Sequence, residues 1–230
     1  MATPTTNLIE IKVPSGRTVR AELVRPRGDE KAAGIVLIHE WWGLNYEMRA
    51  IAADMAGRGY HALAVDLFEG QLAREVNRAR ELMSAVDPSK ARETLVSWVD
   101  WLRNAPDSNG KVATLGFCFG GAWSLNASLA TPVDATVIYY GNVKKSADEL
   151  KTLEGPVLGH FGQLDQSINV QMVDGFRAAL EAARKPHEIY VYEANHAFAR
   201  KEGPNFEPNS AALAEKRTLA FLERYLNPRE

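Results

Sequence analysis

The sequence has almost no cysteine: Cys118 is the only one among 230 residues. A single cysteine excludes a disulfide within the chain, so we expect the reducing cytoplasm to be its compartment. Residues 1–7 lack the basic and apolar regions of a signal peptide, and no apolar run is long enough to span a bilayer. Cys118 is therefore either a packing residue or a nucleophile.

The sequence also lacks an excess of charge of one sign. It holds 27 lysines and arginines against 29 aspartates and glutamates, a formal net charge of −2 at pH 7. Such a balance gives no general attraction to nucleic acid or to an anionic membrane. Repeats, low-complexity segments and long linkers are missing too. With 46% hydrophobic and 24% charged residues, residues 1–230 are predicted to form one globular domain, and we expect a monomer that acts on a small molecule.

Apolar runs alternate with amphipathic stretches, which is typical of a mostly parallel sheet covered by helices on both faces. We predict strands at 8–13, 19–24, 34–39, 60–67, 112–115, 136–140, 157–161 and 189–192. We predict helices at 45–58, 73–86, from 88, from 119, at 170–183 and at 211–226. Asn45 is expected to cap the first helix and Gly59 to end it, and Ser210 is expected to cap the last. The alternation predicts an α/β fold with one doubly wound sheet.

One segment between a predicted strand and a predicted helix carries reactive chemistry. Gly116-Phe117-Cys118-Phe119-Gly120 fits the G-x-C-x-G pattern of a nucleophile elbow, with sulfur in place of the usual hydroxyl oxygen. In so sharp a turn, the residues two positions before and after the nucleophile have almost no room for a side chain, which explains the glycines. The turn exposes the sulfur at a helix N-terminus, whose dipole favours the thiolate. It also aims the backbone N–H of Phe119 at a developing oxyanion.

Two further residues complete a triad with Cys118. Asp165 follows the strand 157–161 and His196 follows the strand 189–192, so each lies past the carboxyl end of a strand, where open α/β sheets place their sites. The order nucleophile, acid, histidine is that of α/β-hydrolases. Taken singly, Cys118 fits a buried packing role, Asp165 a turn or helix cap, and His196 a solvated loop. Together they predict a Cys-His-Asp catalytic triad.

A second candidate segment follows the buried strand 34–39, where one half of an oxyanion hole normally lies in such folds. The backbone N–H of Trp41 is the candidate donor, in addition to that of Phe119. Glu40 is open to two interpretations. It is either a base that pairs with the thiol and takes its proton, or a partly exposed glutamate at a strand end.

These residues and several others resemble the dienelactone hydrolase (carboxymethylenebutenolidase) family over nearly the whole chain. The shared motifs are, in chain order, Glu40-x-x-Gly43-x-Asn45, Ser108-Asn109-Gly110-Lys111-Val112, Gly116-x-Cys118-x-Gly120-Gly121, Tyr139-Tyr140-Gly141, Gly162-x-x-Asp165 and His196-x-Phe198-x-Arg200. The resemblance implies a Cys-His-Asp triad on a single-domain α/β-hydrolase fold, with a mostly parallel sheet and helices on both faces.

The resemblance also implies how the nucleophile is controlled. The glutamate matching Glu40 holds the resting thiol, and substrate binding disturbs that pair and frees the thiolate of Cys118. The arginine matching Arg200 implies a clamp on the carboxylate of an anionic lactone, for which a bidentate guanidinium is well suited. Ala197 stands where well-known members often have serine, and Trp41-Trp42 is bulkier than the typical pair. The resemblance therefore implies the same catalytic triad in this chain, but it does not specify the exact substrate.

The resemblance also implies a second substrate arginine on the predicted helix 73–86, where Arg74, Arg78 and Arg80 compete for the role. Arg80 is our choice because it lies nearest the C-terminal half of that helix. A solvated charged face explains each of the three arginines at least as well.

The sequence thus predicts hydrolysis of small carboxylic esters or lactones through an acyl-enzyme on Cys118. The resemblance implies dienelactone, converted to maleylacetate, as the favoured substrate. Two other interpretations stay open. One is a broad-specificity carboxylesterase for small esters. The other is a non-catalytic small-molecule binding protein, which would need no acid and base together. No cofactor is indicated, and the spacing of His39, His160, His187 and Glu40 does not fit a metal site.

Overall fold

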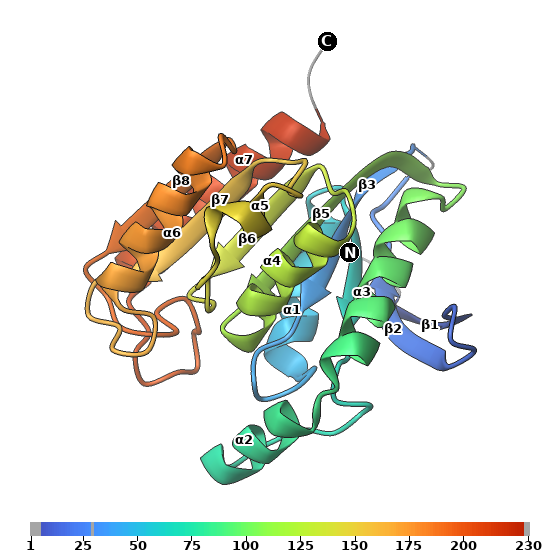
Figure 1. Cartoon of the computed structure of the whole chain (residues 1–230). Helices are drawn as coiled ribbons and strands as arrows, with labels where there is room; N and C mark the ends of the chain where they lie inside the picture. The colour runs from blue at the N-terminus through green and yellow to red at the C-terminus, as the bar shows by residue number, and fades with distance from the viewer. Residues whose placement is uncertain (1–5, 29, 228–230) are drawn as a thin grey trace. The chain divides into compact units, whose positions relative to one another are not determined.

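The computed structural model describes residues 6–28 and 30–227, and the chain divides into two compact units with the boundary between Thr114 and Leu115. Figure 1 colours the first unit from blue to green and the second from green to red. After the first two strands, strands and helical segments alternate along the chain, so the predicted α/β class is confirmed. The expectation of a single domain stays a prediction.

The first unit opens with an antiparallel hairpin of β1 (Thr6–Lys12) and β2 (Thr18–Val24). Then follow β3 (Ala32–Ile38), α1 (Tyr46–Gly57), β4 (His61–Val65), α2 (Val76–Ala85) and α3 (Pro88–Arg103). The strands lie in the order β1-β2-β4-β3. β2 and β4 are antiparallel, whereas β4 and β3 are parallel. β5 (Ser108–Phe117) then runs across the boundary into the second unit.

Burial in the first unit follows the sequence pattern. β3 is buried along almost all of its length, as an uninterrupted apolar run predicts. α3 turns one apolar face inward, which includes Leu95, Trp98, Val99 and Leu102. A Cβ atom on Gly34 of β3 would lie 2.4 Å from Cγ of Leu102. The glycine therefore lets the helix approach the strand closely.

Two helix starts in the first unit are those that the sequence predicts. The side chain of Asn45 accepts a hydrogen bond from the N–H of Met48 and caps α1. Gly59 beyond the helix has φ 97°, a conformation that favours glycine. Asp87 caps α3, which opens with Pro88. Residues 39–45 are therefore the loop that leads from β3 into α1.

The second unit continues from the end of β5 with strands and helices in alternation. Its elements are α4 (Phe119–Ala130), β6 (Ala135–Tyr139), α5 (Ala147–Leu150), β7 (Val157–Gly162), α6 (Val170–Ala182), β8 (His187–Tyr192) and α7 (Pro208–Leu226). β6, β7 and β8 are neighbours in that order and pair in parallel. Their carboxyl ends therefore lie at one edge of the sheet.

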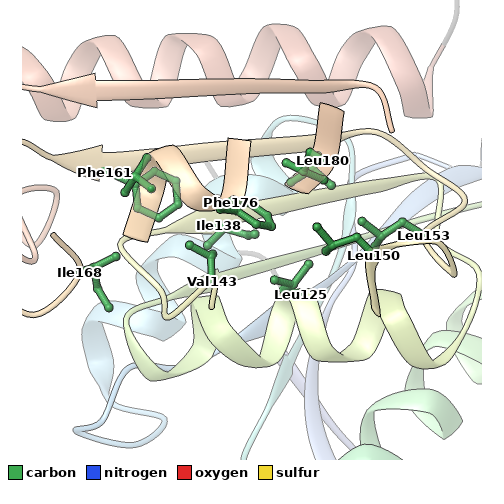
Figure 2. Packing of buried hydrophobic residues seen from close by; sticks show 11 residues of the cluster. Leu125, Ile138, Val143, Leu150, Leu153, Phe161, Ile168, Phe176 and Leu180 are labelled. Carbon is green, nitrogen blue, oxygen red and sulfur yellow. The ribbon is translucent and has the colours of Figure 1, made fainter. Parts of the chain in front are cut away.

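Helices cover both faces of these three strands. Figure 2 shows the apolar layer on one face, where Leu125 of α4 and Phe176 of α6 pack with Ile138 and Phe161 of the strands. Successive strand residues point to opposite faces. The opposite face of the sheet therefore carries Tyr139 and His160, which are the sequence neighbours of Ile138 and Phe161. Both side chains contact α7 through the hydroxyl of Thr218. The side of α4 and α6 is apolar, whereas the side of α7 combines buried apolar residues such as Phe221 and Leu222 with a polar group at Thr218.

Three local predictions differ from the structure. α7 begins at Pro208, because Glu207 accepts hydrogen bonds from the N–H groups of Asn209 and Ser210; Ser210 is not the cap. α2 is shorter than the helix expected at 73–86. α5 was not predicted, although Ser146 and Glu149 form a capping box around its single turn.

Candidate active site

The turn between β5 and α4 has the geometry of a nucleophile elbow. Cys118 alone separates the two elements and has φ 53° and ψ −113°, outside the regions that L-residues normally occupy. A Cβ atom on Gly116 would lie 1.9 Å from the carbonyl oxygen of Gly120, and one on Gly121 would lie 2.8 Å from that of Tyr139. The glycines are thus required by close contacts between backbone segments, as the motif predicts.

Backbone hydrogen bonds hold Cys118 in this conformation. Its N–H donates to the carbonyl of Tyr139 at 2.9 Å, which ties the elbow to the end of β6. Its carbonyl accepts from the N–H groups of Gly121 and Ala122, so it begins the hydrogen bonding of α4. Cys118 is half-buried and lies at the positive end of that helix, with Phe119 as the first helical residue.

Asp165 lies in the loop after β7 and is 2% exposed. One carboxylate oxygen accepts from the N–H groups of Ser167 and Ile168 at 2.8 and 2.9 Å, and the other lies 2.6 Å from Nδ1 of His196. Burial acts to raise the pKa of Asp165, but the hydrogen bonds from His196 and the backbone outweigh it and lower the pKa. The side chain is therefore a fixed, ionised acceptor.

His196 lies in the loop after β8 and joins the other two residues. Its Nδ1 faces Asp165, and its Nε2 lies 3.1 Å from the sulfur of Cys118. Burial acts to lower the pKa of His196, but the hydrogen bonds to Asp165 and Cys118 raise it to about 10. The raised pKa favours the protonated imidazole, with Nδ1 toward the carboxylate of Asp165 and Nε2 toward the sulfur of Cys118.

The loop that carries His196 is itself held in place. The side-chain amide of Asn205 donates to the carbonyl of His196 at 3.0 Å. The next residue, Ala197, has φ 61° in the left-handed region, where a side chain is uncommon. Ala197 replaces the serine expected from the family pattern, and the turn forms with the smaller residue.

Around His196 lie two aromatic residues to which sequence reasoning assigned no role. The ring of Tyr140 packs edge-on against the imidazole with 5.3 Å between ring centroids, and Phe198 packs against Tyr140 at 5.5 Å. Both are almost completely buried. Their signal in the sequence was membership of the motifs that contain Tyr139-Tyr140 and His196-x-Phe198.

The other predicted residues are distributed over both units. Glu40 is 6% exposed and Trp41 is half-buried in the loop after β3, where Trp41 stacks edge-on against Trp42. Arg80 is exposed on α2. Arg200 is half-buried in the second unit, four residues after His196. The structure thus brings Cys118, Asp165 and His196 together.

The roles of Glu40, Trp41, Phe119, Arg80 and Arg200 stay predictions. Of the competing arginines, Arg78 already bonds Glu81 and the side chain of Gln71, while Arg74 is exposed.

In residues 6–28 and 30–227, no group of three or more His, Cys, Asp or Glu side chains could hold a metal ion. None of the helices that the structure describes combines the length and apolar character needed to cross a membrane.

A parallel β6–β8 sheet, a strained elbow after β5, and an acid and a histidine in the loops after β7 and β8 define an α/β-hydrolase fold. The model of the dienelactone hydrolase family matches residues 19–226, so the chain belongs to the dienelactone hydrolase family and is a hydrolase. The predicted family and fold are thereby confirmed.

Relatives in sequence and in structure agree with this assignment. The chain is 30% identical over 229 residues to carboxymethylenebutenolidase from Pseudomonas putida, covering 93% of this chain and 94% of the relative. It is 26% identical over 233 residues to carboxymethylenebutenolidase 1 from Cupriavidus pinatubonensis, covering 96% and 97%. A dienelactone hydrolase-like promiscuous phosphotriesterase from metagenomic libraries superposes with a TM-score of 0.86 over 98% of this chain and 100% of that chain, at 19% identity, and so shares the fold.

Proposed function

We propose that this protein is a cysteine-dependent hydrolase of small carboxylic esters and lactones, with dienelactone converted to maleylacetate as the favoured reaction. The observation that carries the proposal is the unbroken contact from Asp165 through His196 to the sulfur of Cys118. A non-catalytic binding protein does not require a buried carboxylate, a histidine and a strained cysteine in successive contact. The names of the two carboxymethylenebutenolidases support the lactone as substrate.

The first half of the reaction forms a thioester. The thiolate of Cys118 attacks the carbonyl carbon, and the carbonyl oxygen takes the negative charge. In our proposal the backbone N–H groups of Trp41 and Phe119 stabilise this oxyanion. The bond from the carbonyl carbon to the leaving oxygen then breaks, and His196 gives its Nε2 proton to that oxygen. In a lactone the ring opens, and the whole product stays attached to the sulfur.

The second half releases the acid. His196, now neutral, takes a proton from water, and the resulting hydroxide attacks the thioester carbonyl. The C–S bond breaks, the carboxylic acid leaves, and the thiolate of Cys118 and the imidazolium of His196 are restored. The thiolate then regains the proton that Glu40 took when substrate was bound, which returns the resting thiol. Asp165 keeps the proton on Nδ1 throughout, so that Nε2 is the nitrogen that exchanges protons with substrate and water.

Glu40 is proposed as a further catalytic group that takes the proton of the resting thiol when an anionic substrate binds. Its burial does not fit the alternative of a partly exposed glutamate at a strand end. Arg200, and Arg80 as the less supported choice, would hold the substrate carboxylate. We propose a monomer with no cofactor, in a reducing compartment such as the cytoplasm, where a thiol nucleophile stays reduced.

The test compares an anionic lactone with a neutral aryl ester on wild-type protein and on Cys118→Ala. We expect turnover of excess lactone by the wild type and a loss of at least about 10³-fold in the variant, with an unchanged circular dichroism spectrum. Retained turnover in Cys118→Ala would contradict the assignment of Cys118 as the nucleophile. If Glu40 is the proton acceptor, Glu40→Gln should lower lactone turnover in the same assay. Equal kcat/KM for both substrates would favour the broad carboxylesterase, and no turnover of either would favour the binding protein.

A further inference from the structure

We propose that Tyr140 and Phe198 are positioning residues that set the ring plane of His196, and that a buried hydrogen-bond chain through His160 anchors them. This inference rests on the proposed function, but the labelling measurement in its test does not require turnover. All residues concerned lie in the second unit. It assigns a role to the aromatic residues of two motifs that the reaction itself leaves unused.

The first step is an aromatic stack that ends on the imidazole. Tyr192 at the end of β8 packs against Phe198 with 5.1 Å between ring centroids. Phe198 packs against Tyr140 at 5.5 Å and an interplanar angle of 70°. Tyr140 meets His196 at 5.3 Å and 60°. Edge-to-face contacts of this kind have preferred angles, so the stack limits rotation of the imidazole as well as filling space.

The second step is the anchor of the stack. The hydroxyl of Tyr192 accepts from Arg217 at 3.1 Å and lies 2.8 Å from Nδ1 of His160. Because that hydroxyl accepts from the guanidinium, its own proton is available for Nδ1 of His160. The proton of the imidazole is then on Nε2, which donates to the hydroxyl of Thr218 at 3.0 Å.

The third step links this chain to the elbow. Thr218 also lies 2.7 Å from the hydroxyl of Tyr139, and the carbonyl of Tyr139 accepts from the N–H of Cys118. The N–H of Tyr140 donates to the carbonyl of His160 at 2.7 Å. One buried chain therefore contacts the residues that hold the nucleophile and the residues that hold the histidine.

Backbone strain points to the same place. Tyr140 has φ 38° and Ala197 has φ 61°, and such conformations persist only where the surrounding structure fixes them. Tyr140 stacks on the imidazole, and Ala197 directly follows His196. The side chains of His160, Tyr140 and Phe198 are at most 1% exposed, so they fix the histidine from the protein side and leave its solvent side open.

The decisive variant is Phe198→Leu, with Phe176→Leu as its matched control. Both changes remove one buried aromatic ring from the second unit, but Phe176 lies in the apolar layer of Figure 2 on the opposite face of the strands. We expect Phe198→Leu to lower kcat by about 10-fold, since a displacement of 1 Å can lower the rate by about 100-fold. KM should change less than about 2-fold, and labelling of Cys118 by iodoacetamide should slow. Phe176→Leu should lower the melting temperature and leave kcat and labelling unchanged.

A second pair tests the anchor in case Phe198→Leu does not fold. Thr218→Val keeps the shape of the side chain and removes the hydroxyl, while Thr218→Ser keeps the hydroxyl. We expect a kcat several-fold below wild type for the valine variant and near wild type for the serine variant. Equal kcat in both, or equal effects of Phe198→Leu and Phe176→Leu, would overturn the inference. The labelling is measured without substrate, so it decides the positioning role even if Cys118→Ala shows that the proposed reaction is wrong.

Discussion

His160 and His196 lie in the same unit, and their surroundings shift their pKa values in opposite directions. His160 is completely buried between two hydroxyl groups, those of Tyr192 and Thr218. Burial, together with the charge of Arg217, lowers its pKa to about 3. His196 is also mostly buried, but the hydrogen bonds to Asp165 and Cys118 raise its pKa to about 10.

The charge of the partners explains the difference. Hydroxyl groups satisfy both nitrogens of a neutral imidazole, but they do not compensate a positive charge in a low-dielectric core. A carboxylate and a sulfur do compensate it. His160 is therefore a neutral residue that links the strands to α7 through hydrogen bonds. The surroundings of His196 favour its charged form at the edge of the sheet, where we propose that proton transfer takes place.

Exchanging each histidine for glutamine gives the largest expected contrast. His196→Gln should lower kcat/KM by at least about 10³-fold, as removal of a triad member does. His160→Gln should lower kcat by less than about 10-fold but unfold at a lower urea concentration, because a buried hydrogen-bond chain is disturbed. Steady-state kinetics and urea denaturation of both variants measure the contrast. A loss of activity in His160→Gln as large as in His196→Gln would remove the division of roles.

Asp165→Asn makes the surroundings of His196 resemble those of His160. The amide has no negative charge to raise the pKa of His196, and its N–H₂ group favours the wrong tautomer. We expect kcat to fall by about 10² to 10³-fold with the fold intact. The measurement is kcat on the best ester of the panel. A kcat near wild type would mean that another acid orients His196, and Glu193 is the next candidate.

Arg200→Ala tests how far the charged surroundings of His196 extend. If the guanidinium binds the substrate carboxylate, the variant should lose about 1.5–3 kcal/mol of transition-state stabilisation for an anionic lactone and much less for a neutral ester. Lys201→Ala is the matched control, because it removes an exposed cation from the adjacent position. Equal losses of kcat/KM for charged and neutral substrates would exclude the carboxylate clamp.

The smallest effect is the dependence of stability on pH, where the two histidines should act in different ranges. For His160 the folded pKa, about 3, lies below the unfolded value of about 6.5, so the unfolded chain binds the extra proton and stability falls as the pH is lowered from about 6.5 to 3. For His196 the folded pKa, about 10, lies above the unfolded value, so its contribution is complete below pH 6.5 and is lost as the pH rises through 10.

Urea denaturation across both ranges measures these contributions. His160→Gln should reduce the slope of the unfolding free energy against pH on the acid side. One titrating group contributes at most about 1.4 kcal/mol per pH unit to that slope. His196→Gln should flatten the alkaline side. The lowered pKa of Asp165 adds a further loss only as the pH falls through the folded value of that group. An unchanged acid slope in His160→Gln would mean that His160 is protonated in the folded protein.

Much of the site was predictable because its constraints are local. The glycines around Cys118 follow from backbone contacts within the elbow, and Asp165 and His196 follow the ends of strands that apolar runs reveal. The helix starts at Asn45 and Asp87 were predictable for the same reason, since each cap bonds the backbone two or three residues on. The start of α7 was missed because Glu207 is a less common cap than serine.

The positioning residues were not predictable in this way. Tyr140 and Phe198 each follow a strand, and both are residue types that are common in an ordinary core. Their contact with His196 depends on the left-handed backbone at Tyr140 and Ala197, which side-chain type does not reveal for a residue other than glycine. His160 looked like one more residue of an apolar strand, and its partner Thr218 is 58 positions away in sequence.

The backbone of Cys118 has a consequence for the history of this protein. At φ 53° and ψ −113°, glycine would relieve a strain of about 1–3 kcal/mol, and the genetic code separates every cysteine codon from a glycine codon by one base. A descendant that no longer used the sulfur would become more stable by that substitution. Cysteine at this position is therefore retained only while its chemistry is selected, and inactive copies of the gene are expected to drift toward glycine.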